Sequence, residues 1–174
     1  MTTPAIENIV NYYENIEITL VGSFVSIEAI KNHPKVVEGI VLDKKYKSLY
    51  KIYNRLGVFD VYFTFRSSFR AKLLRFFVKA KNKYQFNSSK YQNRHQVERY
   101  ADFVNDSLNI DFPAGNLIIH TSTSKDNKSS KTLGINPGAS YGSAKRWYSE
   151  KFAKIAIELS DKFDIIIFGG SNEQ

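Results

Sequence analysis

Small, hydroxyl-bearing and basic residues gather in one short stretch, Asn136 to Trp147 (NPGASYGSAKRW). Its glycines let the main chain approach an oxyanion closely, its serines offer hydroxyl donors, and its two basic residues add positive charge. The residues concerned are Gly138, Gly142, Ser140, Ser143, Lys145 and Arg146. Groups of these kinds bind phosphate, so the stretch predicts a site for a phosphorylated small molecule.

The predicted secondary structure supports this interpretation. Residues Lys131 to Ile135 read as a short buried strand, and Trp147 to Asp161 has apolar residues at helical spacing. The stretch therefore lies at a helix N-terminus, where backbone N–H groups have no partner in the helix and the helix dipole is positive. The alternative is a plain Gly/Ser connection, since the stretch matches neither the GxxxxGK[ST] nor the GxGxxG pattern.

A second stretch, Arg66 to Arg70 (RSSFR), repeats the same arrangement. It follows a predicted strand, Phe59 to Phe65, and opens a predicted helix, Phe69 to Lys79. Arginine can bind an anion through two parallel N–H groups, so Arg66 is our first candidate for an anion contact, with Ser67, Ser68 and Arg70 behind it. The alternative is an ordinary exposed arginine.

Composition excludes several classes of protein. The chain has 174 residues, 43% of them hydrophobic, which is ordinary globular material. It has no cysteine, no apolar run long enough to span a membrane and no secretory signal in MTTPAIEN, so we expect a cytoplasmic protein. His33 and His120 have no second histidine, cysteine or carboxylate at a metal-ligand spacing, so we expect no metal.

The net charge of +8 is unevenly distributed. Residues 43–99 hold 15 Lys and Arg against three acidic residues, a net charge of +12, so the rest of the chain carries −4. A basic segment rich in aromatic residues suits an anionic partner such as nucleic acid, lipid head groups or a phosphorylated glycolipid. A solvated lysine-rich surface is the alternative.

Hydrophobic periodicity predicts helices that alternate with short strands, which is typical of an α/β fold with a parallel sheet covered on both faces. The chain is predicted to start with a helix that has Thr3 as its N-cap. The other predicted helices are 25–32, 46–56, 69–79, 95–108 and 147–161. The predicted strands are 17–22, 36–42, 59–65, 131–135 and 165–168, with a possible strand at 84–86. The polar residues 121–130 read as a linker between a first domain, 1–120, and a β-α-β unit, 131–174.

The string NPGASYGSAKRW closely resembles the signature of the heptosyltransferases of glycosyltransferase family nine, with most likeness to the heptosyltransferase II type. The resemblance implies two Rossmann-like domains of the GT-B type and a bacterial enzyme that takes heptose from ADP-heptose. It implies that Gly138, Ala139, Ser140 and Lys145 bind the donor diphosphate and that Lys145 neutralises the departing ADP. It also implies that Glu173, which follows Gly169 and Gly170, binds the donor ribose.

On the acceptor side, RSSFR is similar to the family stretch that faces the phosphorylated sugar-lipid. The resemblance therefore implies that Arg66, Ser67, Ser68 and Arg70 contact the lipopolysaccharide inner core at the inner face of the membrane. His95 matches a histidine that opens a helix in relatives, although a lone histidine there is more often a cap. We expect a monomer.

The resemblance also implies a general-base aspartate before Met1 and further residues after Gln174. We therefore interpret the chain as an internal fragment, with the first strand of its first domain and most of its donor domain missing, and expect no turnover from it alone. Two other functions stay open: a basic nucleic-acid-binding module, and a nucleotide or sugar-phosphate binder without catalysis.

Overall fold

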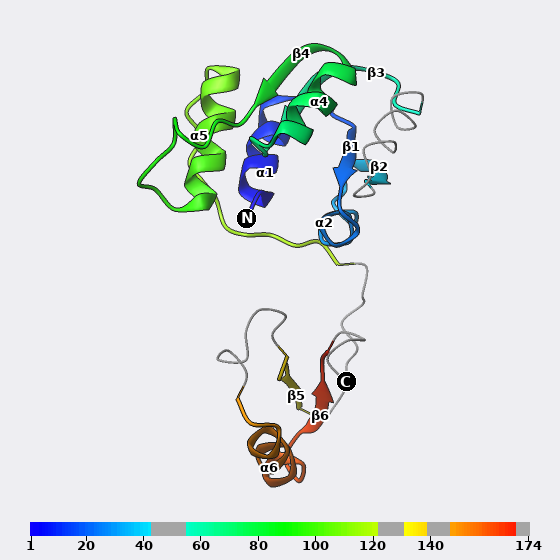
Figure 1. The fold of residues 1–174 in the computed structure, drawn as a ribbon, viewed down its shortest axis with the longest axis vertical. Coiled ribbons are helices and arrows are strands. Elements are labelled where there is room, and N and C mark those ends of the chain that lie inside the picture. Colours follow the sequence, from blue (N-terminus) through cyan, green and yellow to red (C-terminus); the bar gives the residue numbers. More distant parts are fainter. Residues whose placement is uncertain (43–54, 122–130, 139–146, 170–174) are drawn as a thin grey trace. The chain divides into compact units, whose positions relative to one another are not determined.

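The computed structural model describes residues 1–42, 55–121, 131–138 and 147–169. The chain divides into two compact units, Met1–Ser122 and Thr123–Gln174 (Figure 1). The boundary between them lies within the range 121–130 that the sequence predicts as a linker. The assignment of the units to acceptor and donor stays a prediction.

The first unit contains two pairs of parallel strands. Strand β1 (Ile18–Gly22) pairs with β2 (Val36–Val41), and β3 (Val58–Thr64) pairs with β4 (Lys79–Gln85). Among the described residues, the two pairs are not hydrogen-bonded to each other. Each pair is joined through a helix, α2 (Phe24–Glu28) or α4 (Phe69–Phe77), as parallel pairing requires. The α/β class with parallel strands is therefore confirmed.

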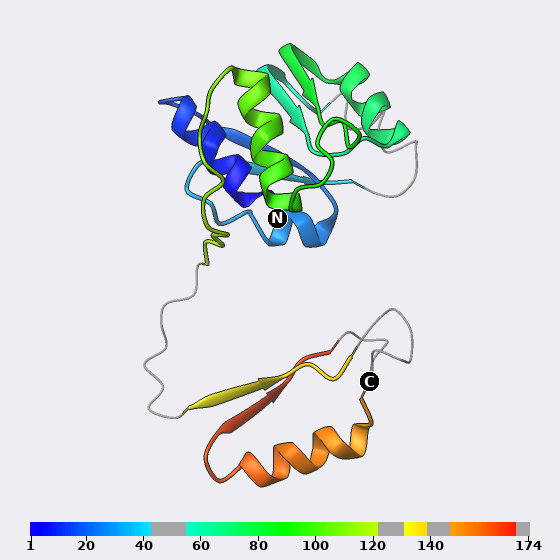
Figure 2. The same ribbon diagram turned by 90° about the vertical axis from the view of Figure 1, so that its left-hand side faces the viewer.

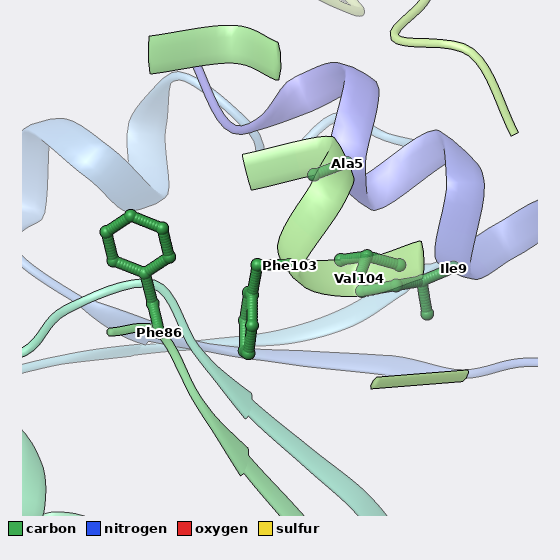
Figure 3. Packing of buried hydrophobic residues seen from close by; sticks show 5 residues of the cluster. All are labelled: Ala5, Ile9, Phe86, Phe103 and Val104. Carbon is green, nitrogen blue, oxygen red and sulfur yellow. The ribbon is translucent and has the colours of Figure 1, made fainter. Parts of the chain in front are cut away.

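Helix α1 (Thr3–Tyr12) packs against α5 (Gln96–Leu108), and the two lie side by side in both ribbon views (Figure 2). Their contact forms a buried cluster with the end of β4, in which Phe86 and Phe103 lie edge to face with ring centroids 5.8 Å apart (Figure 3). The full cluster is Ala5, Ile9, Phe86, Phe103 and Val104. A second cluster, which includes Leu74 of α4, consists of Ile40, Leu56, Leu74 and Val78.

Helix α2 sits unusually close to β2. A Cβ atom added at Gly39 would lie 2.6 Å from Cγ2 of Ile27, a buried α2 side chain. Because a branched side chain held in a core cannot move aside easily, only glycine fits at this position without displacing the helix.

Several predicted boundaries are wrong for identifiable reasons. Thr2, and not Thr3, is the N-cap of α1, and its side chain makes no capping hydrogen bond. Helix α2 ends at Glu28, before the predicted end at residue 32, and turns follow. Strand β4 is longer than predicted, since its alternating lysines 79, 81 and 83 hide the strand pattern. The predicted helix 46–56 lies almost wholly outside the described residues.

The second unit consists of β5 (Thr132–Ile135), α6 (Ser149–Leu159) and β6 (Asp164–Ile167), and its two strands are parallel. Trp147 precedes α6 and packs edge to face on Phe152 at 5.2 Å between ring centroids. Ile135 is 9% exposed, whereas Ile157 is 72% and Ile167 is 65% exposed. No helix among the described residues is long and apolar enough to cross a membrane.

Candidate functional site

The predicted phosphate site begins where β5 ends. The N–H of Gly138 donates a hydrogen bond to Oδ1 of Asn136 at 3.3 Å, so the asparagine side chain closes a tight turn at the start of the loop. Gly138 itself is half-buried. Ala139, Ser140 and Lys145 lie outside the described residues, as does Glu173, so their predicted roles stay predictions.

Helix α6 follows this stretch in the sequence. Its N-cap, Tyr148, makes no side-chain capping bond, and Glu150 is the acidic residue of its first turn. The first backbone N–H groups of a helix have no partner within the helix. These N–H groups are potential donors to an anion, while the carboxylate of Glu150 offsets part of the positive helix dipole.

The loop after β6 lies at the same edge as the loop after β5. The N–H of Phe168 donates to the carbonyl oxygen of Ile135 at 2.8 Å, so the two parallel strands end beside each other. Asn136–Gly138 and Gly169 therefore leave the carboxyl ends of adjacent strands, which is where open α/β sheets bind ligands.

In the first unit, the stretch Arg66–Arg70 follows β3, as predicted. The hydroxyl oxygen of Ser68 accepts a hydrogen bond from the N–H of Ala71 at 3.3 Å, so Ser68 is the N-cap of α4. The carbonyl oxygen of Arg66 accepts a bond from the Gln85 side chain at 3.2 Å, which ties the stretch to the end of β4. Arg66 and Ser67 are exposed and Arg70 is half-buried.

His95 is the N-cap of α5. Its Nδ1 atom accepts a bond from the N–H of Val97 at 3.4 Å, and its own N–H donates to Oε2 of Glu98 at 3.2 Å. This reciprocal capping box gives His95 a structural role at the loop between β4 and α5. Because β3 and β4 are parallel, that loop and Arg66–Arg70 leave the same edge of the sheet.

Ion pairs tie the loop before α5 to the helix. Oδ2 of Asp106 accepts bonds from Nζ of Lys90 at 2.6 Å and from the Tyr91 hydroxyl at 2.8 Å, and Arg94 donates to Asp102 at 2.8 Å. The hydrogen bond from Lys90 lowers the pKa of Asp106, and the same bond raises the pKa of Lys90. Part of the positive charge in the basic segment is therefore compensated within the unit.

The structure brings together three side chains that sequence reasoning kept apart. Oε1 of Glu7 lies 3.1 Å from Nε2 of His33 and 3.8 Å from Nε2 of His120. The sequence has no metal-ligand spacing around either histidine, yet folding brings both beside the Glu7 carboxylate. No local spacing could have revealed the cluster, because its members come from α1, the turn after α2 and the extended segment after α5.

Comparison with known proteins gives consistent results. A family model described as Glycosyltransferase family 9 (heptosyltransferase) matches residues 51–174. Two lipooligosaccharide heptosyltransferase 2 proteins, from Campylobacter jejuni serotypes O:2 and O:6, are 37% and 36% identical over alignments of 183 residues that include the whole chain. The chain spans 57% of the length of these curated relatives.

Two solved structures share the fold. A glycosyl transferase family 9 protein from Veillonella parvula aligns with 98% of the chain at a TM-score of 0.76 and 20% identity, and the match covers 58% of that protein. The E. coli heptosyltransferase WaaC with ADP aligns with 99% of the chain at a TM-score of 0.72 and 14% identity, and the match covers 63% of it. The fold is therefore the Rossmann-like GT-B type.

Proposed function

The chain belongs to glycosyltransferase family 9, and from this premise we propose that it serves the transfer of heptose from ADP-heptose to the inner core of lipopolysaccharide. The observation that carries the proposal is the family match over 51–174, which contains the stretch NPGASYGSAKRW. The relatives are named heptosyltransferases, and one neighbour was solved with ADP.

The donor would bind in the second unit. Its two strand-end loops leave one edge, the turn at Gly138 is fixed by Asn136, and the start of α6 offers uncapped N–H donors. Such donors hold a diphosphate and stabilise the negative charge that grows on it as the sugar departs. We propose that Gly138, Ala139, Ser140 and Lys145 bind this group, Glu173 binds the ribose, and the transfer needs no metal.

The acceptor would bind at the corresponding edge of the first unit. Exposed Arg66 and Ser67 lie at the end of β3, with Ser68 and Arg70 on the first turn of α4. Arginine forms strong, directional contacts with phosphate. We propose that these residues and His95 contact the phosphorylated inner core, that the protein acts as a monomer at the cytoplasmic face of the inner membrane, and that the 174-residue chain alone does not turn over.

The test is binding and turnover of ADP-heptose. The chain joined to the remaining length found in its relatives should consume ADP-heptose with a core acceptor, while the 174-residue chain should not. Lys145→Ala should lower kcat about tenfold or more, because the leaving diphosphate loses a positive charge. The matched control is Lys154→Ala, an exposed α6 lysine paired with Glu158 at 3.8 Å, which should leave kcat unchanged.

Unchanged kinetics in Lys145→Ala would show that this lysine has no part in the mechanism. Turnover by the 174-residue chain would contradict the proposal that this chain alone is inactive. Nucleic-acid binding is the competing function. A labelled single strand titrated at physiological salt separates the two, because a basic binding module would bind it tightly and with a steep dependence on salt.

A further inference from the structure

The cluster of Glu7, His33 and His120 lies within the first unit, where α1, the turn after α2 and the segment after α5 meet. The His33 side chain is 7% exposed, and the two imidazole rings meet edge to face with centroids 4.7 Å apart. One potential ligand atom from each of the three residues lies within 4.8 Å of the others. Two imidazoles and a carboxylate gathered this closely form a donor set that binds divalent transition metals.

A small cavity adjoins the cluster. Its volume is about 10 Å³, and its polar lining consists of Thr3, Glu7, His33 and His120. Two atoms of these residues, Oγ1 of Thr3 and Nε2 of His120, are buried without a hydrogen-bond partner in the described part of the chain. Buried polar atoms rarely stay unpaired, so the cavity calls for an occupant that satisfies them.

We propose that Glu7, His33 and His120 bind one divalent metal ion of the zinc type. Zinc binds imidazole nitrogen and carboxylate oxygen at about 2.0–2.2 Å in a tetrahedral arrangement, which places neighbouring ligand atoms about 3.3 Å apart. The observed separations of 3.1 and 3.8 Å from Glu7 to the two imidazoles bracket this value. A water molecule takes the fourth position, and the Thr3 hydroxyl hydrogen-bonds to it.

One contact limits the affinity of the site. The N–H of Lys35 donates to Nδ1 of His33 at 3.1 Å, so without metal the ring proton sits on Nε2 and points to Glu7. Metal binding at Nε2 moves that proton to Nδ1 and breaks the bond from Lys35. An unpaired donor lowers affinity by about one to two orders of magnitude. The site should therefore bind zinc in the micromolar range.

The ion would hold the segment after α5 against the helices. Among the described contacts, this segment is attached near its start, where Asn105 and Asn8 donate to the carbonyl oxygen of Phe112 at 2.8 and 3.4 Å, and near its end through His120. Glu7 and His120 are far apart in sequence, so a link between them restricts the unfolded chain strongly. The role is structural and separate from heptose transfer.

The experiment is a Zn²⁺ titration of the full chain followed by thermal unfolding, with Co²⁺ as a spectroscopic probe. One ion should bind per chain, 100 μM Zn²⁺ should raise Tm by about 5 °C, and Co²⁺ should give the intense visible bands of a tetrahedral site. Glu7→Gln keeps an acceptor for the His33 ring, so it should fold normally yet bind zinc at least about tenfold more weakly. His120→Gln should do the same.

The matched control is His95→Asn, which removes the other histidine of the chain while asparagine still caps α5. It should leave zinc affinity unchanged. The proposal is overturned if 1 mM Zn²⁺ leaves Tm unchanged, as expected when the cavity holds only water. It is also overturned if Glu7→Gln and His120→Gln bind zinc as the parent does, if His95→Asn abolishes binding, or if two chains share one ion.

Discussion

The two units place similar strand-to-helix loops on cores of very different depth. The first unit encloses two buried clusters, and its loop before α5 is fixed by a capping box and ion pairs. The second unit has Ile135 as its buried apolar residue among those described, and large side chains such as Ile157 are exposed. The described buried core thus lies almost wholly in the first unit, while the signature stretch belongs to the second.

The largest effect should follow from cutting into the deeper core. Phe103→Ala removes a ring that is 4% exposed and contacts Phe63 and Phe86, so it should cost about 3–5 kcal/mol of unfolding free energy. Thermal unfolding should show Tm lowered by about 8 °C or more. Phe76→Ala, at a phenylalanine that is 78% exposed, is the control and should change stability by less than about 0.5 kcal/mol. Equal losses in both variants would mean that the clusters do not carry the stability of this unit.

A smaller and local effect is expected in the second unit. Ile135→Ala should cost about 1–2 kcal/mol, below the usual range for core isoleucines, because its surroundings are shallow. Amide hydrogen exchange should speed up in β5 and β6 and stay unchanged in α1 and α5. Ile157→Ala, at a 72% exposed position, should leave both unchanged. Faster exchange in α5 would show that the two units unfold together.

The smallest effect concerns the pair Lys90–Asp106. The pKa of Asp106 is lowered, so its stabilising contribution is present above the ordinary aspartate pKa and is lost as pH falls through the lowered value. The pKa of Lys90 is raised, so its contribution is present below the ordinary lysine pKa and is lost as pH rises through the raised value. The Lys90 side chain is 60% exposed and that of Asp106 is 47% exposed. Asp106→Asn should therefore lower the free energy of unfolding by at most about 1 kcal/mol at neutral pH.

Denaturant unfolding at pH 7 and at pH 2–3 measures the free energy of unfolding of the parent and of Asp106→Asn. The difference in unfolding free energy between the two should be smaller at the acidic pH. Glu158→Gln, at the exposed α6 pair with Lys154, is the matched control in the second unit. It should lower the free energy of unfolding at pH 7 by no more than Asp106→Asn does. A difference between the parent and Asp106→Asn that grows in acid would contradict the lowered pKa.

The sequence predicted the parts of the fold that depend on local pattern. The alternation of helices and strands and the position of RSSFR after a strand all follow from periodicity and turn residues. Local pattern failed in β4, where three lysines make a strand that pairs with β3 look like a polar segment.

The sites depend on longer-range information. The carboxyl-edge placement of Arg66 follows from parallel pairing, which the sequence implied. The capping role of His95 was one of two readings, and only the geometry of its Nδ1 atom shows it. The cluster of Glu7, His33 and His120 could not be predicted, because it is formed by tertiary packing of segments with no shared spacing.

The close fit of Gly39 beneath Ile27 couples the sheet to that cluster. Helix α2 leads directly into the turn that holds His33, whose N–H donates to the carbonyl oxygen of Ile30 at 2.9 Å. A methyl group at position 39 would lift the helix and carry the imidazole away from Glu7. The absence of a Cβ atom at Gly39 thus helps to determine where the His33 side chain lies.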